Sequence, residues 1–210
     1  MNISRLSLWG LLLLALLFSP FRSFSQTLAL PEDDVTGPRN AFKITLLSLG
    51  SGSSRFTYER AFGLRNSAEF TVGIIGWGWD WMNDTRSRGL LFKLAYKWNL
   101  VPMQRMQTPL AGFYVKPELV YADFAYRDRS MRPKTEYHVH PPEPNYTRQV
   151  ALLAECGYQL VFNWFVFDIY TGLGPSFGTD NDNNYFHSFM LMPTNGHLAF
   201  TAGFRIGIAF

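Results

Sequence analysis

The sequence predicts an all-β fold, an eight-stranded antiparallel up-and-down barrel that crosses a membrane with its strands. Three observations lead to this prediction. From Ala41 onward, apolar and polar side chains alternate with a period of two, as in strands rather than helices. The connections alternate between short turns and long polar loops, a layout typical of outer-membrane barrels. One face of the strands is apolar, whereas the other carries both acids and bases.

The chain opens with MNISRLSLWGLLLLALLFSPFRSFSQ, in which Arg5 precedes an apolar run and Ser23 and Ser25 are small. This layout predicts a secretory signal peptide at residues 1–25. The apolar run is shorter than the ~20 residues that a membrane-spanning helix needs. We therefore expect a periplasmic lead-in at residues 26–40, the barrel at residues 41–210, and export to the cell outer membrane.

The net charge of +3 falls to +1 without residues 1–25, because that segment holds two arginines and no acid. Such a small charge argues against a nucleic-acid partner. A single cysteine, Cys156, excludes an internal disulfide. No cofactor-binding motif is found, so no cofactor is expected.

The eight predicted strands have lengths that suit a membrane, where a tilted strand needs about 9–11 residues. They cover residues 41–49, 55–62, 67–79, 89–98, 112–126, 148–162, 164–177 and 196–210. The outer connections would be GSGSS, 80–88, 127–147 and 178–195, and the periplasmic ones GLRN, 99–111 and Asn163. The turn at 99–111 is longer than this layout favours. We expect a bulge or bend at Pro117, because proline cannot donate to a neighbouring strand.

The polar face predicts a charge network that fills the lumen, as expected of a small barrel. It contains five bases and five acids, which can neutralise one another. These are Lys43, Glu59, Glu69, Lys93, Lys97, Lys116, Glu118, Glu155, Asp168 and Arg205. We interpret the set as a structural plug of salt bridges; the alternatives are acid–base chemistry and a narrow channel.

Aromatic residues gather near the strand ends, which predicts two interfacial girdles. The periplasmic girdle would contain Trp98, Phe162, Trp164 and Phe210, and the outer girdle Trp77, Trp79, Tyr121 and Tyr126.

The chain resembles the small outer-membrane β-barrel families of Gram-negative bacteria, particularly the functionally uncharacterised Bacteroidetes-type ones. The likeness lies in YERAFG (58–63), NSAEFTVGI (66–74), YVKPELVY (114–121), GYQLVFNWFVFDIYTGLG (157–174) and the closing GFRIGIAF. The last segment, with Phe204, Ile206, Ile208 and Phe210, looks like the signal that the barrel assembly machinery reads. The resemblance implies insertion into the outer membrane and leaves the activity open.

The long outer loops carry the remaining candidate sites. Arg127, Arg129, Arg132 and Lys134 could contact lipopolysaccharide phosphates, for which arginine is well suited, or simply be solvated. His138, His140 and Glu136 could bind a metal ion, but a loop with three ligands is weak evidence and no metal site is assigned.

His187 and His197 raise the alternative of a lipid-modifying enzyme similar to lipid A hydrolases. Such chemistry needs a serine beside a base that an acid orients. His187 and Ser188 are neighbours and would diverge on a strand, so no catalytic residue is assigned. The favoured function is therefore structural or surface-interacting, through the outer loops. Outer-membrane lipid and lipopolysaccharide are the expected partners, the assembly machinery is a partner during insertion, and any protein partner stays open.

Overall fold

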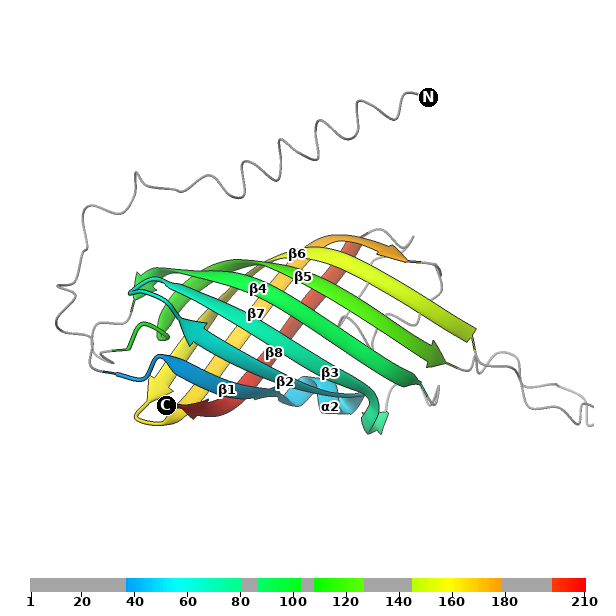
Figure 1. Cartoon of the computed structure of the whole chain (residues 1–210), viewed down its shortest axis with the longest axis horizontal. Helices are drawn as coiled ribbons and strands as arrows, with labels where there is room; N and C mark the ends of the chain where they lie inside the picture. Colours follow the sequence, from blue (N-terminus) through cyan, green and yellow to red (C-terminus); the bar gives the residue numbers. More distant parts are fainter. Residues whose placement is uncertain (1–36, 81–86, 103–107, 127–144, 179–197) are drawn as a thin grey trace, which may run out of the picture. The chain divides into compact units, whose positions relative to one another are not determined.

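The computed structural model describes residues 37–80, 87–102, 108–126, 145–178 and 198–210. Eight antiparallel strands form a closed up-and-down barrel in which each strand pairs with the next and β8 pairs with β1 (Figure 1). This confirms the predicted fold class. The strands are β1 (Asn40–Thr45), β2 (Ser51–Ala61), β3 (Asn66–Asp80), β4 (Arg88–Pro102), β5 (Gly112–Tyr126), β6 (Asn145–Phe162), β7 (Phe165–Gly178) and β8 (Leu198–Ala209). We call the end where β1 begins and β8 finishes the terminal end, and the opposite end the loop end.

The first predicted strand, 41–49, is too long, and GSGSS is not a turn. β1 stops at Thr45, and a short helix, α2 (Leu46–Gly50), leads directly into β2. The Ser48 hydroxyl donates to the Thr45 carbonyl oxygen at 2.7 Å, and such local bonds from serine compete with strand pairing. No helix among the described residues is long and apolar enough to span a membrane.

A bulge near the loop end reverses the alternation of β3. The β2–β3 register shifts between Ser51 and Ser53, and Gly76 adopts a φ of 93°, which favours glycine. Strict alternation would turn Trp77 inward with Ile75. Instead the Trp77 ring lies 6.1 Å from the outward ring of Phe56. The bulge therefore places a predicted girdle residue on the outer face.

Of the bulge or bend predicted at Pro117, the bulge is absent. Pro117 pairs with Ala154 on β6, and the β4–β5 pairing is interrupted only locally on its other side. Ala95 pairs with Glu118 before the interruption and Trp98 with Val115 after it, which is the same register. The N–H that Pro117 lacks thus interrupts the pairing of β5 locally without shifting the register of the strands. The irregularity of this strand pair lies between Asn99 and Val101 instead.

Two apolar clusters occupy the ends of the barrel interior, and the charged side chains lie between them along the strands. The cluster toward the loop end consists of Ile75, Leu91, Val120, Ala122, Phe124, Ala151, Leu153 and Ala199. The cluster at the terminal end consists of Ala41, Ala61, Leu110, Ala111, Val161, Val166 and Ala209.

The connection between β4 and β5 explains part of the terminal cluster, because residues 108–111 fold into the barrel mouth. Leu110 is fully buried. The Thr108 hydroxyl donates to the Pro38 carbonyl oxygen at 2.7 Å, and the Asn99 side-chain amide donates to the Pro109 carbonyl oxygen. The extra residues of this long connection thus cap the lumen at the terminal end.

Shortening this cap should destabilise the barrel. We expect Leu110→Ala to lower the free energy of unfolding by about 2–5 kcal/mol, because it leaves a cavity in a fully buried position. Leu100→Ala is the matched control, since Leu100 is 52% exposed on the outer face of the neighbouring strand. Urea unfolding of the refolded protein measures both. A loss of unfolding free energy for Leu110→Ala no larger than that for Leu100→Ala would show that the cap does not contribute to stability.

Candidate functional site

The structure places all ten predicted lumen charges inside the barrel, where each is buried. It adds Arg55, a sixth base on the interior face of β2 that we had not assigned to the network. Arg55 shares the odd-numbered row of Thr57 and Glu59, so strict alternation could have identified it. We call these eleven side chains the lumen charges.

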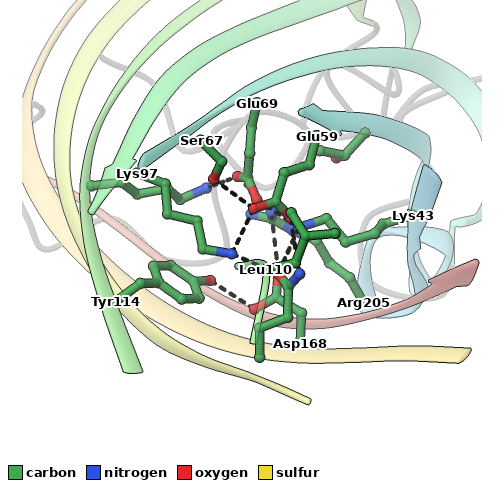
Figure 2. Close-up of polar contacts among 12 residues, drawn as sticks. Lys43, Glu59, Ser67, Glu69, Lys97, Leu110, Tyr114, Asp168 and Arg205 are labelled. Atoms are coloured by element: carbon green, nitrogen blue, oxygen red, sulfur yellow. Dashed lines mark hydrogen bonds and ion pairs between the residues drawn. The ribbon is translucent and has the colours of Figure 1, made fainter. Parts of the chain in front are cut away.

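Lys43 lies at the centre of the network (Figure 2). Its ammonium nitrogen lies 2.6 Å from Glu69, 2.8 Å from Glu59 and 3.1 Å from Asp168. It also donates to the side-chain oxygen of Gln159 at 3.0 Å. One cation from the shortest strand thus contacts carboxylates from three other strands.

Glu69 is the corresponding centre among the acids. Besides Lys43, its carboxylate binds Lys116 at 2.5 Å and Arg205 at 2.9 Å. Arg205 also lies 3.4 Å from Asp168. Attraction to several partners of opposite sign offsets part of the desolvation cost of burying such a charge.

The network continues from Lys116 toward the loop end. Lys116 contacts Glu118 at 3.0 Å and Glu155 at 3.1 Å, and Lys93 contacts Glu118 at 2.5 Å. The Glu155 contact is an ion pair without a hydrogen bond, since neither of its oxygens accepts one within the described residues.

Uncharged side chains complete the coordination, and the sequence reading had missed them. Glu59 accepts hydrogen bonds from Ser67 at 2.7 Å and Gln159 at 3.0 Å, in addition to the one from Lys97 at 2.8 Å. The Tyr114 hydroxyl donates to Asp168 at 2.7 Å. Their inward positions follow from alternation, but their partners depend on contacts across the barrel.

Two glycines make room for tyrosine rings on the inner wall. Gly157 lies opposite Tyr114, and Gly203 lies opposite Tyr170. A side chain at Gly203 would come within 2.7 Å of the Tyr170 hydroxyl. Each ring then carries a cation: Lys97 lies 4.2 Å from the centre of the Tyr114 ring, and Arg205 lies 4.1 Å from that of Tyr170. These contacts position the cations for their carboxylates.

The outer face has the opposite chemistry. Among the side chains that the structure describes, the charged ones on this face are Arg60 near the terminal end and Arg88, Asp123 and Arg148 toward the loop end. Between them the outward positions are dominated by apolar residues, including the exposed Phe70, Leu94, Leu119 and Ile169. Phe204, Ile206, Ile208 and Phe210 also lie on this face, as their alternation with the buried Arg205 requires.

The predicted girdle residues lie near the two ends. Phe162, Trp164 and Phe210 are exposed at the terminal end, and Trp98 is half-buried against Tyr96 with ring centres 4.9 Å apart. Trp77, Trp79 and Tyr121 are exposed toward the loop end, and Tyr126 ends β5.

The loop candidates fall outside the described residues. These are Arg127, Arg129, Arg132, Lys134, Glu136, His138, His140, His187 and His197. Among the described residues, no group of three or more His, Cys, Asp or Glu side chains is arranged to hold a metal ion.

No protein-family model matches the chain, and no curated protein or solved structure matches it. The resemblance to small barrels of Gram-negative bacteria stays a prediction, whereas the eight-stranded antiparallel barrel is a property of the structure itself.

Removing the central cation should be far more costly than removing a surface charge. We expect Lys43→Met to lower the free energy of unfolding by about 3–5 kcal/mol, because Glu59, Glu69 and Asp168 each lose a direct cationic partner while they stay buried. Arg148→Gln is the control: it breaks a 3.0 Å pair with Asp123 at a side chain that is 72% exposed, and should change stability by less than about 0.5 kcal/mol. Urea titration of both variants decides the point, and a small loss for Lys43→Met would contradict the central role of this residue.

Proposed function

We propose that this protein is an integral outer-membrane β-barrel with both termini in the periplasm, acting through its outer loops rather than through its lumen. One observation carries the proposal: the polarity of the barrel is inverted relative to a water-soluble protein. Leu94 is 58% exposed on the outer face, whereas Lys43 and Asp168 have no exposed surface. A soluble protein buries apolar side chains and leaves most of its charges in water.

The backbone supports the same conclusion. A closed barrel pairs its strands with one another, and this is one of the two arrangements that can cross a bilayer. The strands of 11–18 residues from β2 to β8 are long enough for a tilted crossing. The predicted signal peptide and the resemblance of the segment GFRIGIAF to an insertion signal favour the outer membrane over other membranes.

The lumen argues for a structural or surface-interaction role. An ion-paired layer lies between two apolar clusters, and Leu110 closes the terminal end. Eight strands leave an interior just wide enough for side chains. A channel would need a continuous wet path through these contacts. The enzyme alternative rests on His187 and His197, and no contact among the described residues favours it.

Cell fractionation and heat-dependent gel migration test the membrane assignment. We expect the full-length protein in the outer-membrane fraction, with faster migration in unheated than in boiled samples. In planar bilayers it should give no steady conductance, because the lumen is filled. A soluble protein with unshifted migration would refute the barrel assignment in vivo, and steady single-channel currents would refute the plug.

A lysine scan of the outer face tests the contact with lipid independently. Leu94→Lys should lower the unfolding free energy by about 2–4 kcal/mol in lipid vesicles, because the charge would lie within the apolar band. Leu100→Lys, at a similarly exposed leucine nearer the terminal end, should cost only about 0–1 kcal/mol. A water-exposed face would tolerate both substitutions equally, and that result would count against the proposal.

A further inference from the structure

Beside the short strand β1, part of β8 lacks a neighbouring strand within the described residues. β1 pairs with β8 only from Ala41 opposite Ala209 to Thr45 opposite Arg205. β8 continues toward the loop end and pairs with β7 as far as Leu198. Within the described part of the chain, the segment of β8 from Leu198 to Phe204 therefore has a strand on one side only.

The helix α2 follows β1 at this level and packs against β8 as well as against β2 and β3, but it does not replace the missing strand. Its Ser48 carbonyl oxygen accepts hydrogen bonds from the hydroxyls of Ser51 at 2.9 Å and Ser53 at 3.4 Å, which hold it to β2. It also lies close to β3, where a side chain at Gly78 would come within 2.8 Å of the Leu49 carbonyl oxygen. Its 5 residues span only about 7.5 Å, compared with about 3.3 Å for each residue of the open β8 segment.

The backbone groups of the open segment point toward the gap. Asn40 and Phe210 exchange two backbone hydrogen bonds of 3.0 and 2.9 Å, whereas the Ala209 N–H donates to Trp164 beside β7. Bonding direction alternates along an antiparallel strand, so even-numbered residues of β8 face the β1 side. The N–H and C=O groups of Leu198, Phe200 and Ala202 thus face the gap, whereas Phe204 adjoins the last paired residue, Arg205. Unpaired backbone groups cost several kcal/mol each in a lipid environment.

The side chains of β8 beside the gap are small on the inner face and apolar on the outer face. On the inner face, β8 presents Ala199, Thr201 and Gly203, and the Thr201 hydroxyl is buried without a hydrogen-bond partner among the described residues. On the outer face, Leu198, Phe200 and Phe204 are apolar. Leu47 of α2 and residues 202–204 line one apolar hollow of about 480 Å³ that extends across the outer wall.

We propose that the Leu198–Phe204 edge of β8 accepts one extended strand from another protein. The added strand would continue the position occupied by β1 and would alternate apolar residues facing lipid with small or hydroxyl-bearing residues facing Thr201. Backbone hydrogen bonds supply the affinity of such strand addition, and alternate side chains supply its specificity. An acyl chain could fill the hollow but could not bond the backbone edge. The inference rests on the proposed membrane location, since an edge in water would be satisfied by solvent.

The test uses full-length protein refolded in detergent micelles and a fluorescein-labelled seven-residue peptide that alternates leucine and serine. Fluorescence anisotropy should show saturable binding beyond that of empty micelles. Ala202→Pro removes the N–H that faces the gap and leaves the bonds to β7, so it should weaken binding by about tenfold or more while the heat-shifted migration is kept. Ala202→Ser keeps the N–H and should bind like the wild type.

Each other result overturns the inference. Absent wild-type binding, or equal binding by Ala202→Pro, would show that the edge is no acceptor, while heat-shifted migration would leave the proposed function standing. Loss of the fold in Ala202→Pro would show that this N–H is already paired inside the barrel. A wild-type dimer that Ala202→Pro dissociates would identify a second copy as the occupant. Only unshifted migration of the wild type would overturn the proposed function as well.

Discussion

Charge neutralisation inside a narrow apolar wall is the constraint on which the remaining structure depends. Each of the eight strands contributes at least one lumen charge, from Lys43 on β1 to Arg205 on β8. A one-residue slip of any strand would turn its charge outward and its apolar residues inward. Buried ion pairs are weak evidence for net stability, because desolvation offsets much of their attraction. Their stronger effect here is on specificity: only one register lets Glu69 reach Lys43, Lys116 and Arg205 together.

The parts of this arrangement that the sequence predicts are those that depend on alternation alone. Phe70, Val72 and Ile74 can be assigned to one face and Glu69 to the other without knowing any contact. Strand ends and bulges depend on local hydrogen bonds instead. Ser48 bonds to the backbone of Thr45 and helps to form a helical turn, and Gly76 permits a backbone conformation that reverses the alternation for Trp77. Neither event changes the hydrophobic pattern, so neither could be predicted from it.

In the charge network, too, some features follow from alternation alone and others depend on contacts between distant strands. The ten charges were assigned to the interior by their spacing, but which acid meets which base depends on strands far apart in sequence. Gln159 lies 116 residues from Lys43 and bonds to it directly. The tyrosine rings over Gly157 and Gly203 depend on cross-strand register, which a single sequence does not contain. The cap formed by Leu110 was visible only as a turn of unusual length.

The shortness of β1 also has a consequence for how the barrel forms. Closure joins the first and last strands of the barrel, because Asn40 bonds to Phe210, 170 residues away. The entropy of closing so long a loop must be overcome by an interface of five residue pairs, the smallest number in the barrel together with β1–β2. Lys43 and Arg205 belong to this interface, and both bind Glu69 of β3, which does not. Pairing of β1 with β8 is therefore coupled to β3, which belongs to a part of the wall that forms from local hairpins. Local hairpins can form before the first and last strands meet, so they can stabilise this pairing when it forms.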